Sequence, residues 1–225
     1  NLDLTINDED FLCILGPSGC GKSTLIRCIA GFEDYEGSIK VDGQPVVKPG
    51  PDRIMVFQDF NQLFPWKTVL KNITYALKVN GMKDKAEREQ KAKKYLEKVN
   101  LVQYANYYPH QLSGGMKQRV AVARALALES DVLLLDEPFG AIDPKLRLEL
   151  QELVSSLCTT HKKTVVFVTH DIDEAILLSD RIYILNGTPG TIKDEIVIQE
   201  RKPRAADFAL SEEFLEYKRR IISKL

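Results

Sequence analysis

A glycine-rich segment near the start of the sequence constrains the fold more than any other feature. Residues 16–24 read GPSGCGKST, between an apolar run typical of a buried strand (11–15, FLCIL) and a helix-like segment (24–31, TLIRCIAG). A glycine-rich turn that opens a helix aims backbone N–H groups at one point, and this arrangement binds phosphate. That strand–turn–helix context disfavours the alternative of a turn that only caps a helix.

The GxxxxGKS pattern assigns a role to several of these residues. Gly16 and Gly21 permit the tight turn, Lys22 reaches the β- and γ-phosphates of a nucleotide, and Ser23 ligates Mg²⁺. The predicted phosphate site consists of Gly16, Pro17, Ser18, Gly19, Cys20, Gly21, Lys22, Ser23 and Thr24.

A second anion site is predicted about a hundred residues further on. Residues 112–119 read LSGGMKQR and open a predicted helix over 114–128. Ser113, Gly114 and Gly115 stand at its N-terminus, where unpaired N–H groups and the positive end of the helix dipole attract anions. One ATP does not need two such sites on one subunit. The structural alternative is that Ser113 is a plain helix N-cap.

With these two motifs the chain resembles the ATP-binding subunits of ABC transporters. The resemblance implies an α/β fold, a P-loop NTPase parallel sheet with an antiparallel β flank and an inserted α-helical subdomain. It implies that Ser113 of one copy closes on the γ-phosphate held by a second copy, so that a homodimer binds ATP and Mg²⁺. Asp143, in the segment FGAIDP, matches the turn through which one copy senses the other.

Two adjacent carboxylates follow a predicted buried strand, where open α/β sheets bind their ligands. They are Asp136 and Glu137 in VLLLDEP. The resemblance implies that Asp136 is an acceptor of the Mg²⁺ shell and that Glu137 is the base that polarises the attacking water. The structural alternative is that both carboxylates cap the next helix.

Two further polar residues follow predicted strands. His170 comes after TVVFVT and Gln58 after IMVF. The resemblance implies that His170 contacts the γ-phosphate and the water, and that Gln58 monitors Mg²⁺ while it links the core to the helical subdomain. The expected catalytic residues are therefore Glu137, His170 and Gln58, and the expected metal site consists of Ser23, Gln58 and Asp136.

Apolar β-branched runs separated by helical segments predict a parallel sheet that is covered on both faces. Asp42-Gly43 predicts a hairpin within residues 31–50, and residues 71–127 contain no strand pattern. We expect one ABC ATPase domain over residues 1–225, with a core of 1–70 and 128–225 and a helical subdomain of about 71–127. The predicted strands are residues 11–15, 54–57, 132–135, 164–168 and 182–185.

An apolar cluster follows Gln58 in an expected loop, at Phe60, Leu63, Phe64, Pro65 and Trp66. Two interpretations remain open. The side chains either pack beneath the helical subdomain or line a cleft that receives a cytoplasmic helix of a membrane partner.

Composition excludes several classes of protein. The net charge is -1, from 31 Lys and Arg and 32 Asp and Glu, which gives no electrostatic reason to expect nucleic acid as a partner. No apolar run approaches the length of a membrane span and no signal peptide is recognised, so we expect a cytoplasmic location with reduced thiols.

ABC subunits carry an early strand with an adenine-stacking aromatic residue. Neither Phe11 nor Tyr35 stands in the right place, so no adenine platform is assigned.

Within the family, the segments LSGGM, LFPW, HDIDEA and GTPGTI (187–192) resemble the nitrate, sulfonate and taurine import branch. This implies a peripheral position on the cytoplasmic face of the membrane. The implied partners are permease subunits and, indirectly, an extracytoplasmic solute-binding protein. The motifs leave an exporter ATPase open as an alternative. A soluble family member acting on DNA or ribosomes is disfavoured, because the motifs lie too close together for a coiled-coil insertion and the chain has one cassette.

Overall fold

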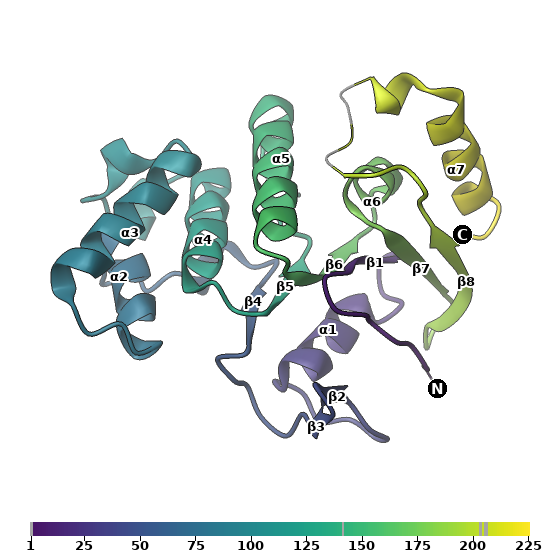
Figure 1. The fold of residues 1–225 in the computed structure, drawn as a ribbon, viewed down its shortest axis with the longest axis horizontal. Helices are drawn as coiled ribbons and strands as arrows, with labels where there is room; N and C mark the ends of the chain where they lie inside the picture. The colour runs from purple at the N-terminus through teal and green to yellow at the C-terminus, as the bar shows by residue number, and fades with distance from the viewer. Residues whose placement is uncertain (1, 141, 203, 205–206) are drawn as a thin grey trace.

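A six-stranded sheet forms the centre of the molecule in the computed structural model, which describes residues 2–140, 142–202, 204 and 207–225 (Figure 1). The strand order is β4-β5-β6-β1-β7-β8, and all neighbours are parallel except β7 and β8. The strands are β1 (Phe11–Leu15), β4 (Arg53–Val56), β5 (Val132–Asp136), β6 (Thr164–Thr169), β7 (Arg181–Asn186) and β8 (Thr191–Val197).

Alternate residues of the central strands enter two different apolar clusters. In β1, Phe11, Cys13 and Leu15 belong to one cluster, whereas Leu12 and Ile14 belong to the other. All five side chains are buried, which explains why the strand is an unbroken apolar run rather than an alternating one. The sheet is therefore covered on both faces, as the sequence predicted.

Helices from different parts of the chain cover the two faces (Figure 1). α1 (Lys22–Ala30) contributes Ile26, Ile29 and Ala30 to the cluster of Leu12. α5 (Pro144–Thr160) and α6 (Ile172–Leu178) pack on the opposite face, and α7 (Glu212–Ile222) contacts α6. Side chains of Asp143, Asp171 and Ser211 accept hydrogen bonds from first-turn amides and so fix the starts of α5, α6 and α7.

A group of three helices lies beside the sheet (Figure 1). α2 (Val69–Val79), α3 (Lys85–Lys98) and α4 (Gly114–Leu128) pack against one another. The predicted stripe of α3 is buried at Ala92, Tyr95 and Leu96, and Val99, just after it, is buried too. The described residues also form four short 3-10 helices, η1 (Phe60–Gln62), η2 (Val102–Tyr104), η3 (Pro109–Gln111) and η4 (Phe208–Leu210).

The antiparallel flank occurs where Asp42-Gly43 predicted a hairpin. β2 (Lys40–Val41) and β3 (Gln44–Pro45) pair antiparallel across these two residues. In the part of the chain that the structure describes, no helix combines the length and the apolar character needed to cross a bilayer.

Apart from one-residue extensions of β5, β6 and β7, two strand assignments differ from the sequence-based expectation. The strand predicted over residues 54–57 covers Arg53–Val56, because Arg53 pairs with Val132 whereas the Phe57 amide donates to the Gln62 side chain. β8 was not predicted. It is an edge strand with mostly exposed, charged side chains, and such a sequence lacks the apolar run that identified the buried strands.

Candidate functional site

The phosphate loop connects β1 to α1 and depends on backbone conformations that glycine adopts most readily. Gly19 and Gly21 have φ angles of 84° and 99°. Gly21 is the N-cap of α1 and supplies no side-chain acceptor, so no cap covers the first-turn N–H groups. Amides with these properties form an anion site at the carboxyl end of β1.

The Lys22 ammonium lies folded over this loop. Its Nζ donates to the carbonyl oxygens of Gly16 and Pro17, at 2.8 Å each, and the residue is 5% exposed. The positive charge is thus held by neutral acceptors rather than by a carboxylate. An anion that binds the loop can therefore interact with the Lys22 ammonium without first displacing a carboxylate from it.

Asp136 ends β5 beside the first turn of α1. Its Oδ1 accepts a 2.9 Å hydrogen bond from Ser23 Oγ, whereas its buried Oδ2 has no partner among the described residues. Burial raises the pKa of this carboxyl, partly offset by the Ser23 bond. A buried carboxylate oxygen without a partner, next to a hydroxyl, fits a hard cation such as Mg²⁺.

Glu137 stands between the other two expected catalytic residues. Its Oε2 accepts a 3.1 Å hydrogen bond from Gln58 Nε2, and its Oε1 lies 3.2 Å from His170 Nδ1. Its backbone has a φ of 44°, which is strained for a residue with a side chain, and its amide donates to Val168. The fold thereby turns Glu137 away from the Asp136–Ser23 pair and toward the loops after β4 and β6.

The alternative role of these carboxylates as helix caps is wrong. α5 begins seven residues after Glu137 at Pro144, and its first-turn amide at Leu146 bonds to Asp143 at 3.2 Å. Asp136 and Glu137 use their side chains for the contacts described above.

A buried carboxylate supports the His170 loop from beneath. Glu174 accepts hydrogen bonds from Thr169 Oγ1 at 2.8 Å and from Gln151 Nε2 at 2.9 Å, and the Asp171 amide donates to Thr169 Oγ1. The network ties the loop after β6 to α5. Burial raises the pKa of Glu174, and the Thr169 bond opposes that shift.

Ser113 and Asp143 lie apart from this cluster. Both are exposed N-caps, which accept bonds from Met116 N at 3.3 Å and from Leu146 N at 3.2 Å. Within the described ranges, no hydrogen bond connects either residue to Lys22, Asp136 or Glu137. Gly114 and Gly115 follow Ser113 in the first turn of α4. A single chain therefore presents this second helix terminus to its surroundings.

Sequence reasoning missed the polar link between α4 and the loop that carries Gln58. Gln118, which is 1% exposed, donates to Phe57 O and accepts from Gln62 Nε2, both at 3.2 Å. Arg124 donates to Gln62 O at 3.0 Å. Gln62 and Gln118 are 56 residues apart in the sequence, so no local pattern signals their contact.

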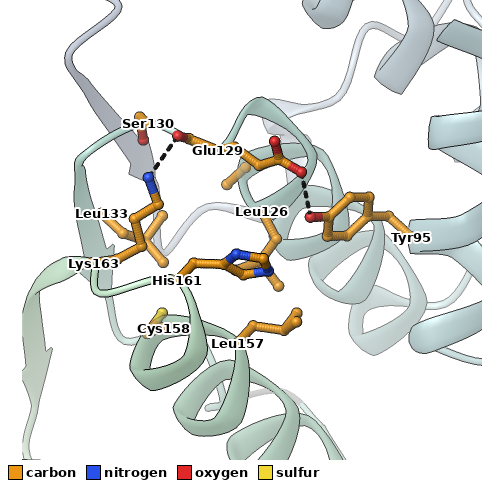
Figure 2. A pocket seen from close by; sticks show the side chains of 10 residues that line it. Tyr95, Leu126, Glu129, Ser130, Leu133, Leu157, Cys158, His161 and Lys163 are labelled. Carbon is orange, nitrogen blue, oxygen red and sulfur yellow. Dashed lines mark hydrogen bonds between the residues drawn. The ribbon is translucent and has the colours of Figure 1, made fainter. Parts of the chain in front are cut away.

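Figure 2 shows a pocket away from these residues, between α3, the end of α4 and α5. Tyr95 and Lys163 both bond to Glu129 there, through its carboxylate and its carbonyl respectively. The cavity volume is about 20 Å³, which holds a water but not a nucleotide. None of the expected site residues lines it.

The family model described as ABC transporter matches residues 1–140. A protein of Methanocaldococcus jannaschii, described as an uncharacterized ABC transporter ATP-binding protein, is 47% identical over 100% of this chain and 83% of its own length. The nitrate import ATP-binding protein of Synechocystis sp. is 43% identical, with 100% and 86% covered. The aliphatic sulfonates import ATP-binding protein of Bacillus cereus is 44% identical, with the same coverage.

One solved structure illustrates the fold likeness. It is described as a dimeric post-hydrolysis state of an ATP-binding cassette bound to ADP and Pi. It superposes with a TM-score of 0.80 at 35% identity, over 89% of this chain and 90% of the other.

Acidification should stabilise the wild-type chain relative to the variant Glu174→Gln. Burial raises the pKa of Glu174. As the pH falls, the native state therefore binds a proton at this carboxyl at a higher pH than the unfolded chain does. The wild-type free energy of unfolding minus that of the variant should therefore increase as the pH falls from 7 to about 5. Urea unfolding at a series of pH values measures it, with the exposed Glu152→Gln as the control for loss of a charge. If the difference in unfolding free energy between wild type and variant stays constant or decreases as the pH falls, the pKa of Glu174 is not raised in the native state.

Proposed function

The chain belongs to the ABC transporter family of ATP-binding proteins, and from this premise we propose that it is the ATP-hydrolysing subunit of an ABC importer. The proposed cargo is nitrate, a sulfonate, taurine or a similar small solute, because relatives at 43% and 44% identity are described as nitrate and aliphatic sulfonate import proteins. A permease and an extracytoplasmic binding protein select this cargo. Residues of this chain do not contact it.

The single observation that carries the proposed hydrolysis is the position of Glu137 between Gln58 and His170. A carboxylate in this position accepts the proton of an attacking water, while His170 and Gln58 orient the water and the γ-phosphate. Lys22 contributes the buried positive charge for the β- and γ-phosphates, and backbone N–H groups of the phosphate loop hold them.

The proposed Mg²⁺ site consists of Ser23, Asp136 and Gln58. The partnerless Oδ2 of Asp136 supports it, since a second oxygen is free for a metal or a metal-bound water while Oδ1 bonds to Ser23. When bound, Mg²⁺ neutralises phosphate charge as the terminal bond breaks.

A second copy of the chain completes the proposed active site. Ser113 is exposed and Gly114 and Gly115 are half-buried at a helix terminus to which no carboxylate of the described residues bonds, and Asp143 is exposed at the start of α5. In a head-to-tail dimer this terminus closes on the γ-phosphate held by the partner. The dimeric arrangement of the similar cassette structure supports this proposal.

The proposed permease contact is the aromatic loop before α2, residues 60–66. In this proposal the subunit lies on the cytoplasmic face of the membrane and the loop faces the permease. Leu63 is packed at 3% exposure, whereas Trp66 is 71% exposed, with its ring tilted at 42° to the Phe64 ring and the two ring centroids 5.7 Å apart. Buried Asn72 bonds to the backbone of Phe64, Lys67 and Thr68 and holds the loop in shape. We treat α2 to α4, about residues 71–127, as a helical subdomain that moves with this loop against a core of residues 1–70 and 128–225.

Two substitutions should impair turnover in different ways. Lys22→Ala removes the buried charge at the phosphates and should abolish both measurable ATPase activity and tight ATP binding. Glu137→Gln keeps the side-chain shape and should retain ATP binding while hydrolysis falls by about 10²–10⁴-fold. Phosphate release and equilibrium binding of a fluorescent ATP analogue measure both properties. Turnover of Glu137→Gln at the wild-type rate would remove Glu137 from the role of base.

Trp66→Ala should weaken association with the permease while it leaves the isolated subunit stable. The side chain is 71% exposed, so truncation creates no cavity, whereas loss of an aromatic anchor from an interface costs about 2 kcal/mol or more. Melting of the subunit and its affinity for permease in detergent are measured together. Leu210→Ala, at 85% exposure near α7, is the matched apolar control. A large decrease in the melting temperature with unchanged permease affinity would contradict the docking role of Trp66.

A further inference from the structure

The segment GTPGTI is one of the import-branch motifs, and its role is open because it touches neither the cargo nor the expected catalytic residues. It contains the turn between β7 and β8, residues 187–190, and the first residues of β8. The backbone amide of Gly190 in this turn donates a 3.1 Å hydrogen bond to the carbonyl oxygen of Cys20 in the phosphate loop. The turn is thus attached directly to the loop.

The approach of the two segments is close enough to exclude a side chain at Gly190. A Cβ built there would lie 2.3 Å from Cys20 O and 3.3 Å from Cys20 C. The clash is with backbone, which no rotamer change relieves. The first residue of the loop meets the same strand, because a Cβ on Gly16 would lie 2.4 Å from Leu185 O. The end of β7 and its turn therefore contact the loop near both of its ends.

The Cys20 side chain strengthens this attachment. It is 4% exposed and belongs to the same apolar cluster as Leu185 and Ile192, which flank the turn. The thiol therefore points into the protein rather than toward the anion site. Cys20 is fixed by its side chain and by its carbonyl, between two glycines, Gly19 and Gly21, whose backbone is otherwise free to rotate.

Peptide geometry turns this attachment into an orientation of the loop amides. In a planar trans peptide the carbonyl of one residue and the N–H of the next point in opposite directions. Since the Cys20 carbonyl is aimed at Gly190, the Gly21 N–H is aimed away from the turn, to the opposite side of the loop. Rotation of this peptide would break the Gly190 bond and misdirect the Gly21 amide.

We propose that Gly190 is a positioning residue for nucleotide binding, which holds the Cys20–Gly21 peptide in the orientation that directs the Gly21 amide to phosphate. The proposal rests on the ATP site proposed above and adds a support for it from the opposite end of the chain. The segment GTPGTI then shapes the phosphate loop and has no part in choosing the cargo.

The variant Gly190→Ala tests the proposal in the full chain, with Gly187→Ala as the control. Gly187 lies in the same turn with a φ of 91°, and a Cβ there meets no phosphate-loop atom, so alanine strains the turn without pushing the loop. Gly190→Ala should raise the Kd of a fluorescent ATP analogue with Mg²⁺ by about tenfold or more, because a small displacement of binding groups is costly. Gly187→Ala should lower the melting temperature with an unchanged Kd. Wild-type affinity in folded Gly190→Ala would overturn the proposal.

Amide hydrogen exchange of the wild-type chain gives a second test that requires no variant to fold. Without nucleotide, the Gly190 N–H should exchange slowly, because it is bonded to Cys20 O. Exchange at the rate of an unprotected amide would overturn the proposal even if Gly190→Ala cannot be prepared. Failure of the wild-type chain to bind the analogue would contradict the ATP site instead, and the exchange rate would still report on the turn.

Discussion

Parallel backbone pairing of β5, β6 and β1 determines where the phosphate loop, Asp136, Glu137 and His170 lie. Asp136 pairs with Val168 and Leu15 pairs with Thr169, so these three strands end side by side. The phosphate loop, the Asp136–Glu137 pair and His170 follow directly. One further ladder bond, from the Glu137 amide to Val168 O, turns Glu137 toward the His170 loop. Any substitution that shifts this register moves all three loops together.

The electrostatics of the site follow from this crowding at one edge. Lys22 and Asp136 are both buried, yet they bond to loop carbonyls and to Ser23 rather than to each other. Both charges therefore remain available to phosphate and to a metal ion. Glu137 is likewise held by neutral Gln58 and by His170. The protein maintains these buried charges without pairing them with each other, which fits the nucleotide and metal site proposed above.

The sequence allowed prediction of features that depend on neighbouring residues. The strands of the core, the start of α4 at Gly114 and the phosphate-loop turn each follow from a local pattern of apolar residues, glycines and caps. It could not show the support of that loop by Gly190, the Glu174 network or the Gln62–Gln118 pair. These contacts join residues far apart in sequence, and no periodicity records them. The exposure of Trp66 shows that this side chain does not pack beneath the helical subdomain, and a loop sequence does not determine such exposure.

Ser113 is exposed and accepts a hydrogen bond only from Met116 among the described residues, so the proposed active site needs a second copy of the chain to bring this helix terminus to the nucleotide. The most direct test is the ATPase rate per molecule as a function of protein concentration, with sedimentation to report the oligomer. The rate per molecule should rise with protein concentration as dimers form. A rate independent of concentration, from a chain that sediments as a monomer throughout, would contradict it.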